Sequence, residues 1–323
     1  MKINKSTMKM WSRIGSRAAY GMAALELGKK YDDLILLTGD TSTSAGLDRF
    51  KKTFPEKYLD VGIAEQNMVG IAAGLASEGL QVFTSTFSPF QTMRCCEQIK
   101  VNIGYMNHKV CMVGLASGLV LGMLGYTHCC IEDISIMRSI PGITVVSPAD
   151  CGETVKAVLA AIEHDKSVYI RLTGGSPNPP IYFDDFDFTI GKANILREGN
   201  DLAIIACGSM VNNALEASDI LNNGKLKSSV IDMHTIKPID TEIIEKISTS
   251  HNLIVTVEEH SIIGGLGSAV SEYLSTLNQK PPLLSIGIND SYGVAGSYES
   301  LLKKRLLLPD QIANTIVNRY YSL

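Results

Sequence analysis

The chain has 323 residues, of which 45% are hydrophobic and 19% charged, and its formal net charge is −4. This length predicts about two domains, and the composition is that of a globular protein with a buried core. The slight acidic excess and the absence of a lysine and arginine run argue against nucleic acid or a membrane surface as partners. No apolar run approaches the roughly 20 residues that span a bilayer, and no secretion signal follows Met1. We therefore expect a cytoplasmic protein.

The seven cysteines do not form a pattern of disulfides or metal ligands. Their number is odd, and four of them stand in two adjacent pairs. Such a set is a poor disulfide framework, and no Cys-x-x-Cys or paired histidine spacing suits zinc. We expect reduced thiols and predict no metal ligands on this chain. The cysteines are Cys95, Cys96, Cys111, Cys129, Cys130, Cys151 and Cys207.

Strands alternate with helices in the first half of the chain, a pattern that predicts parallel βαβ units. Asp150 and Glu153, after Pro148, give one helix a clear start as a capping box. An extended segment ends near Val61. We expect strands at residues 34–37, 81–86, 109–115, 143–147 and 168–172, with helices at 14–25, from 64, from 90 to 105, from 131 and from 151.

Residues 174–180, which read Gly-Gly-Ser-Pro-Asn-Pro-Pro, have the composition of a linker. A second α/β set follows it. We predict an α/β fold with two three-layer, parallel-sheet domains, at residues 1–180 and 181–323. The second domain should have strands at 202–206, 229–232, 253–257 and 283–286, and helices at 210–221, 240–247, 267–277, 298–306 and 310–320.

Glu65 is the only carboxylate between Asp60 and Glu78, and it stands where an extended segment passes into a helix. The helix has an apolar stripe at i, i+3, i+4 and i+7, formed by Met68, Ile71, Ala72 and Leu75. Gly70 and Gly74 keep it thin, so it can lie close to a neighbour. Glu65 is either a first-turn residue favoured by the helix dipole or a functional carboxylate, and its spacing leaves both open.

Two other places could carry chemistry. Phe87 and Phe90 stand three residues apart just past a strand, where they form either a core pair or a surface that stacks a flat heterocycle. His128 lies in a glycine-punctuated loop without a periodic partner, which makes a functional role and a structural one about equally plausible.

The second half contains two weaker signals. The Gly264-Gly265-Leu266-Gly267 run opens a helix but lacks the full dinucleotide fingerprint, so packing explains it better than phosphate binding. Glu258, Glu259 and His260 end a strand and could form a site. The family resemblance described below favours subunit packing for these residues, and we predict no catalytic role for the second domain.

Four runs together resemble the transketolase family. They read DVGIAEQNMVGIAAGLASEGLQVFTSTFSPF at 60–90, GYTH at 125–128, IEDISIMRSIPGITVVSPAD at 131–150 and VYIRL at 168–172. YGVAGSYESLLKK at 292–304 looks like the family's closing segment. The resemblance covers nearly the whole chain and points to the half of these enzymes that holds the pyrimidine-binding and C-terminal domains. Deoxyxylulose phosphate synthase and the β subunits of 2-oxo acid dehydrogenases share that layout.

The resemblance implies thiamine diphosphate as cofactor and assigns roles to the residues. Glu65 corresponds to the catalytic carboxylate that hydrogen-bonds the pyrimidine ring and drives it to the imino form. Phe87 and Phe90 match the aromatic residues beside the pyrimidine, and Asp40 matches an acidic residue near the cofactor. His128 matches the catalytic histidine that faces the substrate. Arg17 and Ser44 match positions that contact phosphate or sugar.

The other half of a thiamine enzyme is missing. A Gly-Asp-Gly motif and a later Asn normally hold the diphosphate through a metal ion, and the nearest run here is Gly39-Asp40-Thr41. The resemblance therefore implies a split enzyme. A partner subunit would carry the diphosphate and Mg²⁺ or Ca²⁺, in an assembly of two copies of each chain.

The substrate pocket departs from the sugar phosphate enzymes at three places. Ala116 stands where those enzymes carry a histidine, Met123-Leu124 where they carry Glu-Asp, and Thr173-Gly174 where they carry a second arginine. Two lost charge-assisted hydrogen bonds weaken binding on the order of a hundredfold or more. We predict that ordinary ketose phosphates are poor substrates. A non-phosphorylated or nucleotide-linked sugar, or a small donor such as pyruvate beside Met123 and Leu124, would replace them.

Three hypotheses remain. The main one is a transketolase-like ketol or acyl transferase with altered specificity in sugar metabolism. The second is the β subunit of a 2-oxo acid dehydrogenase-like or deoxyxylulose phosphate synthase-like enzyme. The third, a non-catalytic subunit that scaffolds its partner, is disfavoured because Glu65, Phe87, Phe90 and His128 are retained.

Overall fold

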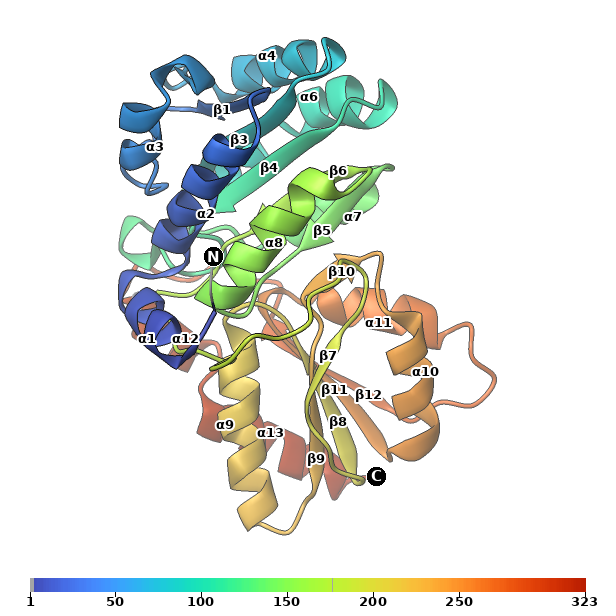
Figure 1. Ribbon diagram of the computed structural model, residues 1–323. Coiled ribbons are helices and arrows are strands. Elements are labelled where there is room, and N and C mark those ends of the chain that lie inside the picture. The colour runs from blue at the N-terminus through green and yellow to red at the C-terminus, as the bar shows by residue number, and fades with distance from the viewer. Residues whose placement is uncertain (1–2, 176) are drawn as a thin grey trace.

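Two β-sheets, each covered by helices on both faces, are stacked one above the other in the computed structural model, which describes residues 3–175 and 177–323 (Figure 1). Ser176, in the predicted linker, and the first two residues lie outside this description. The elements of the first half are α1 Lys5–Ile14, α2 Ser16–Lys30, β1 Leu34–Thr38, α3 Asp48–Thr53, η1 Pro55–Lys57, β2 Tyr58–Asp60, α4 Glu65–Ser77, β3 Gln81–Phe87, α5 Ser88–Gln91, α6 Cys96–Gln98, the π-helix η2 Ile99–Tyr105, β4 Val110–Leu115, η3 Gly122–Leu124, α7 Asp133–Ser139, β5 Ile143–Val146, α8 Cys151–Glu163 and β6 Ser167–Arg171. Those of the second half are β7 Asn194–Arg197, β8 Leu202–Ala206, α9 Met210–Asn223, β9 Ser228–Asp232, β10 Thr235–Lys237, α10 Thr241–Ser250, β11 Leu253–Ser261, α11 Leu266–Leu274, β12 Leu283–Ile288, α12 Tyr298–Lys304 and α13 Pro309–Tyr320.

The first sheet has the strand order β10-β5-β6-β4-β3-β1-β2, and every pair is parallel except β10 with β5. Its strands are largely apolar because both faces are covered. Helices α2 and α8 bury one face, and α4, η2 and α7 bury the other. The carboxyl ends of β1, β3 and β4 therefore share one edge, where ligands of open α/β sheets bind.

The second sheet has the order β12-β11-β8-β9-β7, with β7 antiparallel at its edge. Helices α9 and α13 cover one face, and α10 and α11 cover the other. The predicted α/β class is thus confirmed, with one antiparallel edge strand added to each sheet. Because β10 leaves the second half to join the first sheet, the two units share a continuous core. A domain boundary after residue 180 stays a prediction.

Most predicted strands lie within a residue or two of the expected place, but three local predictions were wrong. The first predicted helix, at 14–25, corresponds to α2 but begins only after Gly15, whose φ of +83° is left-handed, and Ile14 belongs to a separate helix, α1, that was not predicted. The helix expected after Phe90 is split into α5, α6 and η2. The capping box of α8 is half formed, because Asp150 accepts the Glu153 N–H whereas Glu153 accepts the N–H of Ala149.

Helix α4 begins at Glu65 as predicted, and its stripe lies on the sheet through Met68 and Ala72. Its two glycines were expected to allow a close approach, but a Cβ built at Gly70 or Gly74 would meet no atom within 4 Å among the described residues. That face of α4 is therefore open within this chain.

None of the helices that the structure describes is long and apolar enough to cross a bilayer. This agrees with the hydropathy of the sequence, in which no apolar run reaches that length.

Candidate active site

Glu65 lies at the carboxyl end of β1, buried to 3% exposure although it is a charged residue. Its side chain packs over Gly39, where a Cβ would stand 3.2 Å from the Glu65 Cγ. A side chain at position 39 would press on the glutamate, which would have to shift by a few tenths of an ångström. A buried carboxylate of this kind requires a partner, since an isolated charge in the interior is strongly unfavourable.

Arg94 is that partner, and the sequence analysis missed it. Its Nη1 donates to Oε2 of Glu65 at 2.7 Å, while the arginine side chain remains 40% exposed. The guanidinium carbon also lies 3.9 Å from the centroid of the Phe90 ring, a cation–π contact. A flat cation therefore stacks on an aromatic ring and hydrogen-bonds Glu65 at the same time. Glu65 is consequently not in the wholly apolar surroundings that its sequence suggests.

The structure brings Phe87, Phe90 and His128 together. The ring centroids of Phe90 and His128 are 5.4 Å apart, and those of Phe87 and Phe90 are 6.3 Å apart, both edge to face. Both phenyl rings are half-buried, so they are not an ordinary core pair. The imidazole is half-buried as well, and its Nδ1 lies 3.0 Å from Thr127 Oγ1. The end of β3 thus contacts a loop that lies about forty residues further along the chain, and the three rings form one surface.

Asp40 and Asp60 shape the turns beside Glu65. Asp40 is exposed and adopts a left-handed φ of +56°, which aspartate tolerates better than most residues. Its backbone N–H and that of Gly62 both donate to Oδ1 of Asp60 at 3.0 Å. Asp60 thereby ties the end of β1 to the start of α4. Sequence alone offered only its place two residues before Gly62 as a signal.

Two of the predicted substrate residues, Arg17 and Ser44, lie on neighbouring segments. Arg17 is half-buried at the start of α2 and lines a cavity of about 60 Å³ with Val120 and Gly174 among others. Burial lowers the pKa of its guanidinium. Among residues 3–175 and 177–323 no carboxylate forms an ion pair with it. The loop that holds Ser44 packs on the same helix, since a Cβ at Gly46 would meet the Arg17 carbonyl oxygen at 3.0 Å.

Met123 and Leu124 belong to η3 and are 74% and 57% exposed. They belong to the same loop as His128 and Val120, and both side chains are open to solvent. They are therefore available to an occupant from outside this chain. Ala116, at the start of the loop, has a left-handed φ of +53°, a strained conformation for alanine.

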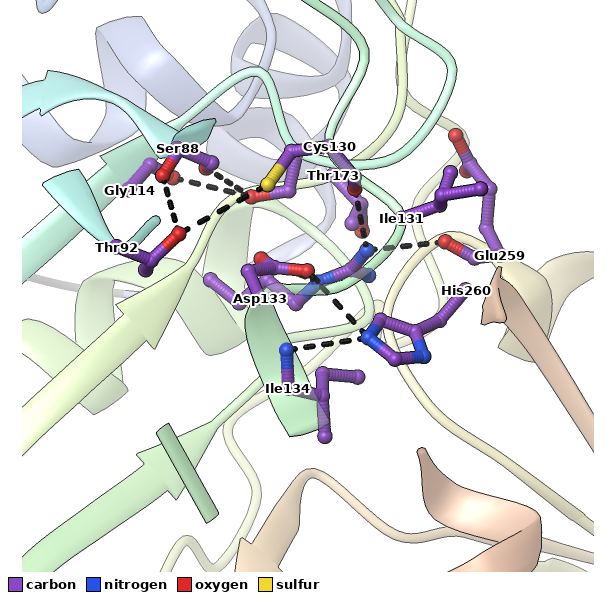
Figure 2. A network of polar contacts seen from close by, with 12 residues as sticks. Ser88, Thr92, Gly114, Cys130, Ile131, Asp133, Ile134, Thr173, Glu259 and His260 are labelled. Atoms are coloured by element: carbon purple, nitrogen blue, oxygen red, sulfur yellow. Dashed lines mark hydrogen bonds and ion pairs between the residues drawn. The ribbon is translucent and has the colours of Figure 1, made fainter. Parts of the chain in front are cut away.

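A buried ionic network lies beneath this loop (Figure 2). Asp133 accepts from Arg171 Nε at 2.8 Å and from the Tyr169 hydroxyl at 2.7 Å, and all three side chains are at most 1% exposed. Arg171 Nη2 also donates to the Glu259 carbonyl oxygen at 2.9 Å, which crosses from the first domain to the second. Glu258, Glu259 and His260 are therefore buried inside the chain, and the expectation that they pack against another subunit was wrong.

Comparison with known families identifies both halves of the chain. Residues 12–177 match the transketolase pyrimidine-binding domain, and residues 191–312 match the transketolase C-terminal domain. The chain belongs to the transketolase family. This family membership confirms the resemblance of the four sequence runs, and its pyrimidine-binding domain implies dependence on thiamine diphosphate.

Several similar chains of this family are named as single sections or subunits. A putative transketolase C-terminal section from Methanocaldococcus jannaschii is 42% identical over 94% of this chain and 95% of its own length. A 6-deoxy-6-sulfo-D-fructose transketolase subunit from a Clostridium species is 39% identical over 89% of each chain. An apulose-4-phosphate transketolase subunit from Phocaeicola vulgatus is 40% identical over 88% of this chain and 90% of its own.

A solved structure shares the arrangement of both domains. It is described as a split gene transketolase, inactive β4 tetramer, and it superposes with a TM-score of 0.85 at 37% identity. The match covers 94% of this chain and 97% of that one. Both domains of this chain therefore have the transketolase fold.

The residues on this chain fit the pyrimidine half of the cofactor. Glu65 offers a buried carboxylate, and Phe90 offers an aromatic face against which a flat group already stacks, the Arg94 guanidinium. No group of three or more His, Cys, Asp or Glu side chains in the described part of the chain could hold a metal ion.

Proposed function

We propose that this chain is the pyrimidine-binding subunit of a split, thiamine diphosphate-dependent transketolase-like enzyme. The observation that carries the proposal is the pairing of buried Glu65 with a flat cation that stacks on Phe90. An aminopyrimidine uses the same two groups, a carboxyl group that shares a proton with its ring nitrogen and an aromatic face. The reaction is the transfer of a two-carbon ketol or acyl unit to an aldehyde or ketone.

When bound, the cofactor supplies a nucleophilic carbon for this transfer. Glu65 shares a proton with the pyrimidine ring nitrogen and so favours the imino tautomer. Phe87 and Phe90 hold the ring plane, and Asp40 lies at the neighbouring turn. Arg94 now holds the Glu65 carboxylate and the Phe90 face, so it would have to leave both for a pyrimidine to bind there. Because Arg94 is partly exposed, it can move into solvent or to the partner.

The substrate end lies on the loop that holds His128. His128 donates or accepts a hydrogen bond at the substrate's carbonyl or hydroxyl oxygens. Arg17 and Ser44 bind a more distant polar or anionic group of the sugar. Met123 and Leu124 supply an apolar wall in place of carboxylates. We propose a modified sugar as substrate, which is supported by relatives named for a sulfosugar and for apulose 4-phosphate.

The partner subunit completes the cofactor site. It would carry the Gly-Asp-Gly motif that this sequence lacks and hold the diphosphate with Mg²⁺ or Ca²⁺. The open face of α4 and the name of the solved relative, an inactive β4 tetramer, support an active assembly of two copies of each chain. A 2-oxo acid dehydrogenase-like β subunit is the second candidate, and a lipoyl carrier as acceptor would distinguish it.

The proposal is tested by Glu65→Gln in the complex reconstituted with the chain encoded beside this one. Loss of an acid–base group reduces turnover by about 10²–10⁴-fold, and we expect a reduction in that range. Glu78→Gln is the matched control, because Glu78 is exposed at the other end of the same helix. Turnover of Glu65→Gln within a few-fold of wild type, on a substrate that the wild type uses, would show that the catalytic assignment is wrong.

A further inference from the structure

The loop that carries His128 is closed at its base by a short antiparallel bridge. Gly118 N–H donates to the Cys130 carbonyl oxygen at 2.7 Å, and Cys130 N–H donates to that of Gly118 at 2.9 Å. Everything between these two residues is irregular apart from the single turn η3. Within the loop, the Gly122 carbonyl oxygen accepts the Gly296 N–H at 3.0 Å and the Tyr126 hydroxyl accepts from Arg305 Nη2 at 2.8 Å. The base is therefore one of several contacts that place His128 against Phe90.

Glu259, on β11 of the second domain, touches the base directly. Its Oε1 accepts the Leu119 N–H at 2.5 Å, and its Oε2 accepts the hydroxyls of Ser209 at 2.7 Å and Tyr298 at 2.6 Å. Both carboxylate oxygens are thus occupied, and the side chain is 1% exposed. Burial raises the pKa of Glu259, and the three hydrogen bonds oppose that rise.

Gly118 shows how closely the loop approaches. Its φ is +71°, and a Cβ built on it would collide with Oε1 of Glu259. Any side chain would displace either the loop or the carboxylate, so a glycine is required on both grounds. The Glu259 main chain holds the other end of the base, because Arg171 Nη2 lies between its carbonyl oxygen at 2.9 Å and that of Cys130 at 3.4 Å (Figure 2).

We propose that Glu259 is a positioning residue of the active site: from the second domain it fixes the base of the loop of residues 118–130 and so sets His128 against Phe90. This gives the second domain a part in the reaction although it supplies no group that touches substrate or cofactor. Only the statement that His128 faces the substrate rests on the proposed function. The anchoring itself does not.

The sequence provides a matched set of variants. Glu259→Leu removes the acceptor for the Leu119 N–H. Glu259→Gln keeps it, because its amide oxygen can face Leu119 while the hydroxyls of Ser209 and Tyr298 turn to accept. Glu258→Leu is the control, since Glu258 is equally buried but accepts from Leu266 and Gly267 at the start of α11, away from the loop.

Hydrogen exchange of the full chain tests whether Glu259 holds the loop. The protection of the backbone amides is measured separately over residues 117–131 and 264–275. A lost hydrogen bond to a buried charge corresponds to roughly a 10- to 100-fold fall in protection. We expect that fall over the loop in Glu259→Leu, over α11 in Glu258→Leu, and over neither segment in Glu259→Gln. Unchanged loop protection in Glu259→Leu would overturn the proposal. If that variant does not fold, Gly118→Ala tests the same contact from the loop side.

The effect of the anchor on catalysis is measured in the reconstituted complex. Glu259→Leu should lower kcat/KM for the substrate by at least about tenfold while the Kd for thiamine diphosphate stays within about twofold, and Glu259→Gln should restore kcat/KM. A loosened loop with unchanged kcat/KM would overturn the positioning role. A wild-type complex that binds no thiamine diphosphate would refute the proposed function instead, and the exchange experiment would still decide whether Glu259 anchors the loop.

Discussion

The two ends of the candidate site are built in different ways. At the cofactor end, Glu65 and Phe87 lie at the boundaries of regular elements of one sheet, so their places follow from β1, β3 and α4. At the substrate end, His128, Met123 and Leu124 lie on an irregular loop whose base is held from the other domain by Glu259 and Arg171. Because the two ends rest on separate supports, the substrate end can change while the cofactor end is kept. We propose that this chain combines a kept cofactor end with a changed substrate end.

Arg171→Met tests the support of the substrate end, and it should cause the largest loss of unfolding free energy. This change leaves Asp133 buried without its charge partner, and breaking a buried pair costs about 3–5 kcal/mol of unfolding free energy. Chemical denaturation should show that loss. Arg197→Met, which breaks a partly exposed pair with Asp219, should cost about 1 kcal/mol or less. Equal losses in the two variants would mean that the network does not hold the substrate end.

Substrate choice tests whether the loop end has been rebuilt. We expect turnover of xylulose 5-phosphate by the reconstituted complex to be roughly a hundredfold or more below turnover of its true substrate, because the resemblance predicts that Ala116 and Thr173-Gly174 replace two charged phosphate contacts. Steady-state kinetics with both substrates measures this. Rates on xylulose 5-phosphate that are typical of transketolases would contradict the altered specificity.

The contact between the domains should also respond to pH. Burial raises the pKa of Glu153, on α8, and of Asp232, at the end of β9, and their mutual repulsion raises that of Glu153 further. An acid whose pKa is raised by folding stabilises the fold when protonated, and this stability is lost as pH rises above its ordinary value of about 4. The nearby His234 has the opposite dependence, since burial lowers its pKa to about 4.

Asp232→Asn separates the pH dependence of the carboxyl pair from that of His234, because His234 is present in both the variant and the wild type. The amide still accepts from the Tyr182 hydroxyl and carries no charge at any pH. Between about pH 4 and about pH 7, the pKa values of Asp232 in the unfolded and the folded chain, the unfolding free energy of this variant relative to wild type should rise by up to about 1.4 kcal/mol per pH unit. Asp184→Asn, at an exposed position, should show no trend. A flat difference for Asp232→Asn would mean that the pair is ionised throughout.

The smallest effect concerns the cofactor end. If Arg94 occupies the place of the pyrimidine, Arg94→Met should tighten thiamine diphosphate binding to the reconstituted complex by about three- to tenfold, the size of a half-exposed ion pair. Titration calorimetry measures the Kd, with Arg319→Met on α13 as a charge control. Weaker binding in Arg94→Met would make this arginine a supporting contact of the cofactor and not its stand-in.

The sequence predicted the helices and strands well where the local pattern of apolar residues is strong. Buried apolar strands such as β8 and the start of α4 at Glu65 were predictable from local pattern. The edge strands β7 and β10 were not, because short partly buried segments carry little periodicity and pair only through the tertiary fold. The break at Gly15 was missed because apolar spacing continues across it.

The candidate site was predictable to a similar degree. Glu65, Phe87, Phe90 and His128 were chosen from sequence, and the aromatic residues and the histidine do meet. The importance of Arg94 and Glu259 was not foreseen, because it lies in contacts with residues 29 and 140 positions away. Single-sequence patterns do not contain such pairs. The roles of all six remain predictions for experiment.

The most direct test of the split cofactor site is binding of thiamine diphosphate in the presence of Mg²⁺, measured by calorimetry with this chain alone and with its partner. The account predicts negligible binding to the chain alone and saturable, magnesium-dependent binding to the complex, at one cofactor for each pair of chains. Tight magnesium-dependent binding to the chain alone would contradict it.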